Sequence, residues 1–318
     1  MLDEILVRLF SGGGITIEEA LDLNNCCSTD DLCDAADKVR AHFHGDSLDT
    51  CSIVNARSGR CSEDCKWCSQ SRYHSTGINE YESISSDGLM AAAAANDRRG
   101  VRRLSLVTSG RKVSPADIGH FCEMYRMLRQ CTSMSLCASM GLLGRDGLQA
   151  LYDAGVRRYH CNLETSSEYF PSLCSTHSHA DKLRTIAMAR EVGMEVCSGG
   201  IIGMGESMRD RLLMVREAVD AGAVSVPVNI LNPISGTPLA GMPPLSDDEI
   251  LRTVALMRLV APRVVMRFAG GRARLSHETT ERILRGGMNG AMIGDLLTTV
   301  GNKVDEDYAL FDRIGYKY

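Results

Sequence analysis

Three cysteines in one short segment have the spacing of an iron–sulfur site. Cys61, Cys65 and Cys68 form a C-x₃-C-x₂-C pattern within SGRCSEDCKWCSQS. Zinc usually takes four ligands, commonly as two spaced C-x₂-C pairs, and the sequence has no second pair. Three thiolates leave one iron of a 4Fe–4S cube without a protein ligand, and that iron stays open to an exogenous group. The segment therefore predicts a 4Fe–4S cluster with one open iron.

Three further cysteines lie inside segments with the pattern of β-strands. Cys137 (SLCAS), Cys161 (YHCNL) and Cys197 (EVCSGG) fall in the third, fourth and fifth expected strands. Adjacent parallel strands lie about 4.8 Å apart, so inward-facing thiols on neighbouring strands can converge on one cluster. The alternative is that each thiol is a small buried hydrophobic group. Cys51, at the start of the first strand, is a fourth candidate ligand, although core is the preferred interpretation. His160 is expected to point away from the Cys161 side because strand neighbours alternate.

The elements that must position these cysteines alternate between strand and helix patterns. Residues 1–45 predict an N-terminal helical extension, and residues 46–318 predict one barrel domain. Eight short apolar segments separated by amphipathic ones favour an α/β fold, a (β/α)₈ TIM-type barrel with chemistry at the C-terminal ends of its strands. The expected strands are residues 50–56, 102–108, 133–139, 157–163, 194–202, 224–231, 263–270 and 289–295.

Composition and charge exclude several classes of function. The 318 residues carry a net charge of −5, and the pI is about 5.9. This charge offers no basic field for nucleic acid, and no apolar run approaches the roughly 20 residues that cross a bilayer. Thirteen cysteines without an export signal predict metal ligation or buried thiols in a reducing cytoplasm, not a disulfide framework. We expect a cytoplasmic protein with neither nucleic acid nor membrane as a partner.

The cysteine spacing resembles the signature of the radical S-adenosylmethionine (SAM) superfamily. From about residue 45 onward, HCNLETS, VCSGGIIGMGES, VPVNIL…GTPL and MRFAGGR follow in the order and spacing that resemble the biotin synthase family. The resemblance implies that the open iron binds SAM and yields a 5′-deoxyadenosyl radical. It implies conversion of dethiobiotin to biotin, with sulfur from an auxiliary iron–sulfur cluster. It also implies a flavodoxin or ferredoxin electron donor and a homodimer.

The resemblance also suggests how the auxiliary cluster is held, and here the sequence departs from the familiar pattern. That pattern is a 2Fe–2S cluster with three Cys and one Arg, and Cys137, Cys197 and Arg267 fall on three of those positions. The fourth position is Ser105, whereas Cys161 stands where the familiar enzymes carry a His. The chain in this respect resembles a variant class associated with anaerobes. We therefore expect a 4Fe–5S-like cluster held by Cys137, Cys161 and Cys197, with Arg267 near it balancing its charge.

The resemblance implies further contacts to SAM and to the substrate. Two residues apart on one strand, Asn162 and Glu164 project to the same face and match the family's contacts to the SAM ribose. Asn162 and Asn229 match contacts to the ureido ring of the substrate. Alternative roles are helix capping for Asn162, a surface position for Lys182 and a satisfied buried amide for Asn229. The remaining expected SAM contacts are Trp67, Thr108, Lys182 at the carboxylate, and Gly200, Ile201 and Glu206 near adenine.

Two alternative functions are compatible with the first cluster. Another radical SAM enzyme of the same barrel type, resembling methylornithine synthase or the hydrogenase maturases, would need no thiols on three neighbouring strands. A non-catalytic iron–sulfur scaffold or redox sensor would bind a cluster without cleaving SAM, and would need neither Asn162 nor Glu164. The six remaining cysteines are expected to be packing or surface thiols: Cys26, Cys27, Cys33, Cys122, Cys131 and Cys174.

Overall fold

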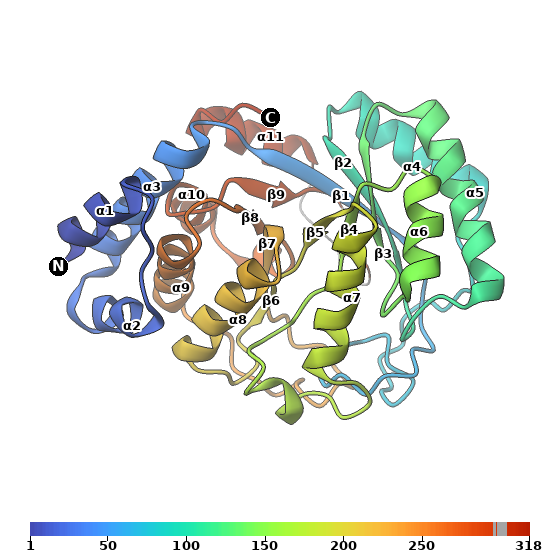
Figure 1. Cartoon of the computed structure of the whole chain (residues 1–318), viewed down its shortest axis with the longest axis horizontal. Helices are drawn as coiled ribbons and strands as arrows, with labels where there is room; N and C mark the ends of the chain where they lie inside the picture. Colours follow the sequence, from blue (N-terminus) through green and yellow to red (C-terminus); the bar gives the residue numbers. More distant parts are fainter. Residues whose placement is uncertain (295–296, 298–303) are drawn as a thin grey trace.

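A computed structural model describes residues 1–294, 297 and 304–318 of the chain and contains a closed parallel β-barrel surrounded by helices (Figure 1). The strands hydrogen-bond in the order β5-β4-β3-β2-β1-β9-β8-β7-β6, and β5 also pairs with β7. This last pairing closes the ring. The strands are β1 (Asp49–Arg57), β2 (Arg103–Thr108), β3 (Ser135–Ser139), β4 (Arg158–His160), β5 (Glu195–Cys197), β6 (Gly200–Ile202), β7 (Ala223–Ile230), β8 (Val265–Phe268) and β9 (Gly290–Met292).

The expected (β/α)₈ barrel is confirmed, with one strand position split in two. The segment expected as a single strand over residues 194–202 forms β5 and β6, both of which pair with β7. The chain bends between them at Gly199, where an added Cβ would lie 2.1 Å from the carbonyl oxygen of Pro227. The last residue of the expected strand 289–295 lies outside the described residues.

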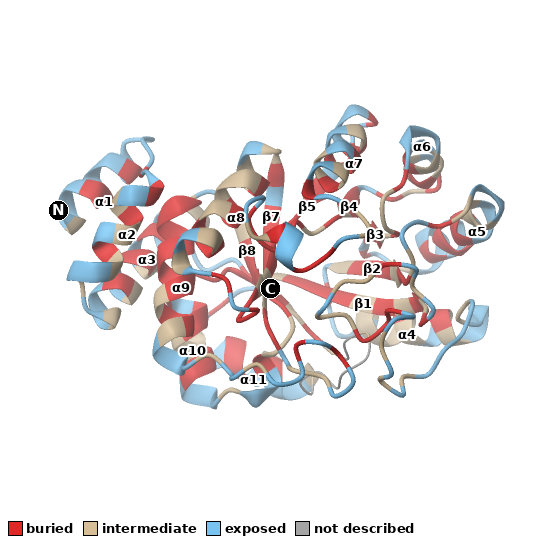
Figure 2. Cartoon of the chain, turned by 90° about the horizontal axis from the view of Figure 1, so that it is seen from below, coloured by how far each residue is buried: buried red, intermediate tan, exposed pale blue. Residues whose placement is uncertain are grey.

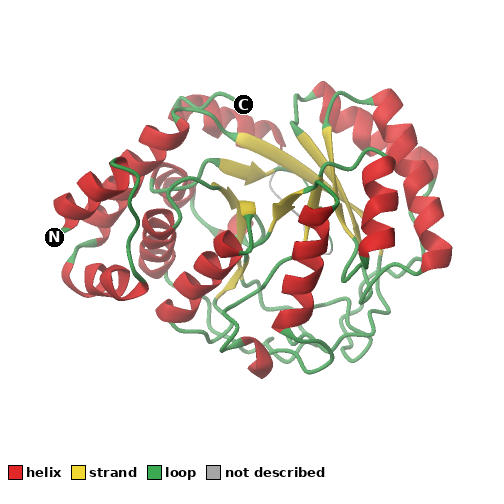
Figure 3. Ribbon diagram, in the orientation of Figure 1, coloured by secondary structure: helices red, strands yellow, loops and turns green. Residues whose placement is uncertain are grey.

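Helices lie around the strands of the barrel (Figure 3), and a serine residue precedes most of them. Six helices start after a Ser whose side chain accepts a hydrogen bond from the backbone of the first turn. Such caps satisfy N–H groups that the helix itself leaves unpaired. The barrel helices are α4 (Ser86–Arg98), α5 (Pro115–Cys131), α6 (Arg145–Asp153), α7 (His179–Glu191), α8 (Met208–Asp220), α9 (Asp247–Val260), α10 (His277–Arg285) and α11 (Val304–Ile314), with 3₁₀ turns at Phe170–Ser172 and Arg272–Arg274.

The N-terminal segment is helical, as expected, and packs on one side of the barrel (Figures 1 and 2). It contains α1 (Leu2–Phe10), α2 (Ile17–Cys26) and α3 (Thr29–His44). Helix α3 lies against α9, and α2 contacts α8 and α9. The boundary predicted at residue 45 falls on the glycine that ends α3. A division into two domains stays a prediction.

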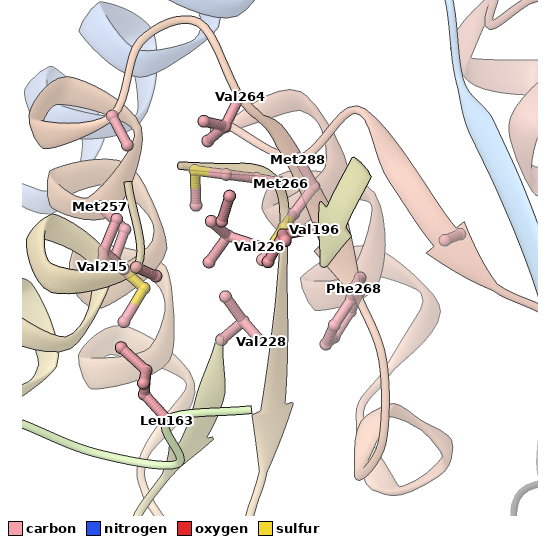
Figure 4. Packing of buried hydrophobic residues seen from close by; sticks show 14 of the residues in the cluster. Leu163, Val196, Val215, Val226, Val228, Met257, Val264, Met266, Phe268 and Met288 are labelled. Atoms are coloured by element: carbon pink, nitrogen blue, oxygen red, sulfur yellow. The ribbon is translucent and has the colours of Figure 1, made fainter. Parts of the chain in front are cut away.

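The side chains of each strand alternate between the barrel interior and the surrounding core. On β7 and β8, Val226, Val228, Met266 and Phe268 pack outward in the hydrophobic core (Figure 4). Arg267 lies between the last two and faces the interior. This period of two is what a parallel barrel requires, because one face of every strand meets the helices and the other meets the lumen. No helix among the described residues is long and apolar enough to cross a membrane.

Candidate active site

The first three predicted cysteines lie in the loop between β1 and α4, residues 58–85, which we call the cysteine loop. Its backbone is fixed by hydrogen bonds: the N–H of Cys61 donates to the carbonyl of Gln70 at 2.9 Å, and the N–H of Cys68 donates to the carbonyl of Cys65 at 3.0 Å. All three thiols are partly buried. Burial raises the pKa of Cys68 to about 11. The thiol is therefore neutral near pH 7 unless a metal ion displaces its proton.

A cavity of about 380 Å³ fills the barrel interior and opens toward the cysteine loop. Its volume is in the range of small-molecule sites. Trp67 and Cys68 line it at the loop end, and Asn162, Glu164, Ile201 and Asn229 line it from the strands, together with residues of the barrel floor. We define the floor as Cys51, Cys137, Cys197, Ser105, Arg103, Arg158 and Arg267, all of which line the same cavity.

Three thiols meet at the floor from three different strands. Cys137 and Cys197 were both predicted to do so, and the third is Cys51, which was expected to be core. Burial, followed by the charge of Cys51, raises the pKa of Cys137 to about 12. Burial acts most strongly on Cys197 and raises its pKa, but a hydrogen bond with His160 and the charges of His160, Arg267 and Arg158 together outweigh burial and lower that pKa to about 7. Three thiols at the floor are therefore available to bind one metal cluster. The thiol of Cys197 ionises most readily, because its pKa of about 7 is close to neutral pH.

The expectation that Cys161 joins this group is wrong for the geometry of the structure. Cys161 is 7% exposed and packs in the hydrophobic core outside the lumen. Alternation explains this, because Arg158, His160 and Asn162 all line the cavity and the residue between the last two must face the other way. His160 does point away from the Cys161 side, as expected, but that direction is the lumen. Because Cys161 and Asn162 are adjacent in one strand, they cannot both face the lumen, and the sequence alone reveals this conflict.

Two buried arginines, Arg158 and Arg267, and the half-buried Arg103 surround the floor thiols. Arg267 is 2% exposed and donates to the carbonyl of Asp49 at 2.8 Å, and Arg103 donates to the Asp49 carboxylate at 3.0 Å. Arg158 was missed by sequence analysis, and its Nε donates to Glu195 at 2.9 Å. Three cations therefore meet two carboxylates at the closed end of the barrel. The sequence did contain a signal for Arg158, because this residue lies two positions before His160 and therefore shares its strand face.

Some of the floor's hydrogen-bonding capacity is unused. Within the described residues, Nη1 of Arg158, Nη2 of Arg267 and Oγ of Ser105 are buried without a hydrogen-bond partner. The nearest carboxylate oxygens of Asp49 lie 3.7 Å from Arg158 and 3.4 Å from Arg267, as ion pairs only. Buried unpaired donors are costly. An anionic group bound by the three thiols would satisfy them, so the residues present fit an auxiliary iron–sulfur cluster.

The wall above the floor is built around two backbone contacts between neighbouring strands. The N–H of Glu164 donates to the carbonyl of Gly199 and the N–H of Ile201 donates to the carbonyl of Glu164, both at 2.9 Å. Glu164 has a φ of 74°, a left-handed conformation that costs a non-glycine residue about 1–3 kcal/mol. Its carboxylate accepts from the Asn162 amide at 3.3 Å. Asn162 and Glu164 thus share one face, as predicted, and the carboxylate keeps free acceptor capacity toward the cavity.

Asn229 lies on β7 in register with Ile201 of β6, and its side chain reaches the backbone of Gly200 in the cavity wall. Its amide nitrogen donates to the carbonyl of Gly200 at 3.0 Å, and its amide oxygen accepts from the N–H of Gly270 at 2.9 Å. One N–H and one lone pair remain for a guest. Gly200 has no space for a side chain, because an added Cβ would lie 2.2 Å from the carbonyl oxygen of Glu164.

Four predicted SAM contacts are not among the described residues that line the cavity: Thr108, Lys182, Gly200 and Glu206. Glu206 points back into its own loop, where its carboxylate accepts from the N–H of Gly203 at 2.7 Å and from Arg211 at 2.6 Å. Lys182 is 8% exposed on α7, with Nζ 5.5 Å from the centre of the Phe170 ring. Thr108 is buried at the end of β2, and its hydroxyl has no partner within the described residues. In this structure Glu206 shapes the Gly-rich loop.

Comparison with known proteins agrees with this geometry over the whole chain. The Radical SAM superfamily model matches residues 56–218, and the Biotin and Thiamin Synthesis associated domain matches residues 227–317. The biotin synthase of Porphyromonas gingivalis is 49% identical over 317 residues, covering 100% of this chain and 96% of the relative. The chain belongs to the biotin synthase family. The biotin synthase of Parabacteroides distasonis is 46% identical and covers 99% of this chain and 96% of the relative.

Solved structures with the same fold are more distant than these biotin synthases. Methylornithine synthase superposes with a TM-score of 0.85 at 18% identity, covering 98% of this chain and 96% of that chain. The FeFe-hydrogenase maturase from Carboxydothermus hydrogenoformans superposes with a TM-score of 0.84 at 17% identity, covering 99% and 78%. These two likenesses show the barrel fold alone. Membership of the biotin synthase family, at full-length identities above 40%, outweighs the alternatives of those two enzyme types.

Proposed function

We propose that this protein converts dethiobiotin to biotin by radical SAM sulfur insertion. The observation that carries the proposal is a single cavity reaching from the cysteine loop to three buried thiols at the floor. When bound, a 4Fe–4S cluster with SAM supplies a radical able to remove hydrogen from an unactivated carbon, and an auxiliary cluster supplies sulfur. A substrate between the two sites lies within reach of both.

Cys61, Cys65 and Cys68 would hold the SAM-binding 4Fe–4S cluster. Their spacing and the hydrogen-bonded loop that carries them support this assignment. Trp67 and Ile201 line the adjoining part of the cavity and would pack against SAM. Glu164 and Asn162 would bind its ribose. Lys182, with the Glu164 carboxylate near its ammonium group, would meet the SAM carboxylate.

Cys51, Cys137 and Cys197 would hold the auxiliary cluster, with Cys51 in the place first assigned to Cys161. The unpaired donors of Arg158 and Arg267 support an anionic guest at this position. Three thiolates and an excess of cationic side chains favour a 4Fe–5S-like cluster over 2Fe–2S. Iron analysis of protein reconstituted without oxygen separates them, since two four-iron clusters give about eight irons per chain and the smaller auxiliary cluster gives about six.

Asn162 and Asn229 would orient the ureido ring of dethiobiotin. Each amide makes two hydrogen bonds to neighbouring residues and keeps one N–H and one lone pair, which match the donors and acceptors of a cyclic urea. The remaining partners are proposed from the family resemblance: a flavodoxin or ferredoxin as electron donor and a second copy of the chain in a homodimer, in the cytoplasm.

The decisive experiment incubates the reconstituted protein with SAM, dithionite and dethiobiotin in the absence of oxygen. We expect biotin and 5′-deoxyadenosine by mass spectrometry. Deoxyadenosine without biotin would keep the radical chemistry and reject the substrate. Neither product from a protein with its full iron content would favour a non-catalytic scaffold.

A further inference from the structure

A second group of potential metal ligands joins Cys65 of the cysteine loop to two residues that the proposed reaction does not use. The segment after the 3₁₀ turn Phe170–Ser172 carries His177 and Cys174, and Cys174 was expected to be a packing or surface thiol. It is tied to the cysteine loop at several points. The N–H of Lys66 donates to the carbonyl of Leu173 at 3.0 Å, and the Asp64 carboxylate accepts from the N–H of Ser175 at 2.9 Å.

The distances within this group suit a tetrahedral cation. The Sγ atoms of Cys65 and Cys174 are 3.7 Å apart, and Sγ of Cys174 is 3.3 Å from Nδ1 of His177. All three ligand atoms lie within 4.8 Å of one another. Bonds of about 2.3 Å to sulfur and 2.0–2.1 Å to nitrogen require edges of about 3.8 Å for S–S and 3.6 Å for S–N. The protein therefore already has nearly the required spacing.

The chemistry of the ligands selects the class of cation. Two thiols and one imidazole are the donors that zinc and ferrous iron prefer, and calcium or magnesium would require oxygen. Glu63 lies 2.7 Å from Nδ1 of His177, so a bound cation would take the place of the proton now shared by these two groups. The side chains of Glu63 and His177 are only 7% and 6% exposed, which limits competition from water.

We propose that, when the SAM cluster is absent, Cys65, Cys174 and His177 bind one zinc or ferrous ion, with solvent as the fourth ligand. Cys65 is shared, so this ion and the 4Fe–4S cluster are alternative occupants of the same loop. An ion held here keeps Cys65 from the cluster. The competition rests on the proposed role of Cys65 in the cluster, whereas binding of the single ion does not.

Cobalt titration of the full-length, cluster-free chain without oxygen tests the binding. We expect one Co²⁺ per chain, with thiolate-to-metal charge transfer and the strong visible bands of tetrahedral coordination. Cys174→Ser and His177→Gln should each weaken binding at least about tenfold, the size of effect seen for lost supporting contacts at metal sites. Cys131→Ser, at an exposed helix end, should leave it unchanged.

Cys61→Ser is the decisive control, because Cys61 belongs to the C-x₃-C-x₂-C motif but not to the proposed site. Unchanged cobalt binding in this variant supports the proposal. A loss in Cys61→Ser with no loss in Cys174→Ser or His177→Gln would overturn it and put the ion on the motif itself. Because two substitutions probe the site, misfolding of one, detected by circular dichroism, leaves the other to decide.

Zinc competition tests the consequence for cluster assembly. One equivalent of Zn²⁺, added before iron and sulfide, should slow appearance of the 4Fe–4S absorption in the wild type severalfold. The same addition should have little effect on Cys174→Ser or His177→Gln. Equal inhibition of all three proteins would reject the competition. Biotin formation by the zinc-free wild type, measured separately, reports on the proposed function alone.

Discussion

The cysteine loop and the floor hold their thiols in opposite ways. Cys61, Cys65 and Cys68 follow one another in a loop whose shape depends on its own backbone hydrogen bonds. Cys51, Cys137 and Cys197 come from three strands far apart in the sequence, and the barrel ladder fixes their spacing. The loop is also surrounded by uncommitted ligands such as Cys174, whereas the floor is surrounded by arginines. The cysteine loop can therefore exchange the side chains that bind a metal, whereas the barrel fixes the geometry and charge of the floor before a cluster binds.

The largest effect is expected from the cysteine loop. Cys68→Ala removes one of three ligands and should abolish SAM cleavage, because the remaining two thiols do not hold a cube with one open iron. Deoxyadenosine and biotin, measured by mass spectrometry, should both fall to background. Iron should fall by about four per chain, with the floor cluster retained. Continued deoxyadenosine formation would contradict the assignment of this loop.

A matched pair at the floor tests which thiols face the lumen. Cys51→Ala should abolish biotin formation while leaving deoxyadenosine formation intact, because only the auxiliary cluster is lost. Cys161→Ala removes a thiol of similar burial from the outer face and should leave sulfur insertion intact. The reverse result would restore Cys161 as a ligand and show that the strand faces the other way in the loaded enzyme.

The Gly-rich loop near the cavity wall depends on a buried ion pair. Glu206→Ala leaves Arg211 without this partner, with both side chains almost fully buried, and should lower the free energy of unfolding by about 3–5 kcal/mol. Chemical denaturation measures the change. Glu191→Ala removes an exposed pair with Arg145 and serves as the control, with an expected loss of at most about 1 kcal/mol. Equal losses would mean that Glu206 does not support the loop.

The smallest effect is expected for the charge at the floor. Arg158→Met keeps much of the side-chain volume but removes the unpaired donor, and should lower retention of the auxiliary cluster about tenfold. Iron remaining on the protein after a timed challenge with a chelator measures this. Arg157→Met is the control, since Arg157 lies outside over the Tyr152 ring. If both variants keep their iron equally, the Arg158 donor does not contact the cluster.

These two regions also differ in how far the sequence reveals them. The barrel, the N-terminal helices and the cysteine loop all follow from local patterns: alternating strand and helix segments, serine caps and one cysteine spacing. The floor depends on which face of each strand turns inward. After β4, alternation shows only that Cys161 and Asn162 cannot both face the lumen, and contacts with the neighbouring strands decide which of them does. Cys161 was therefore assigned to the lumen although Asn162, its neighbour, was assigned there too. The Cys65, Cys174 and His177 group was missed because it joins two loops distant in sequence.

The position of α9 has a consequence for how the molecule unfolds. This helix is buried along most of its length between the barrel and α3. Arg252 on α9 donates to the carbonyl of Cys27, and the buried guanidinium of Arg258 lies 3.3 Å from Nε2 of His44. Removing residues 1–45 would therefore expose an apolar helix face and leave these arginines without part of their hydrogen bonding. We therefore expect the N-terminal helices and the barrel to unfold together, in a single transition that calorimetry would detect.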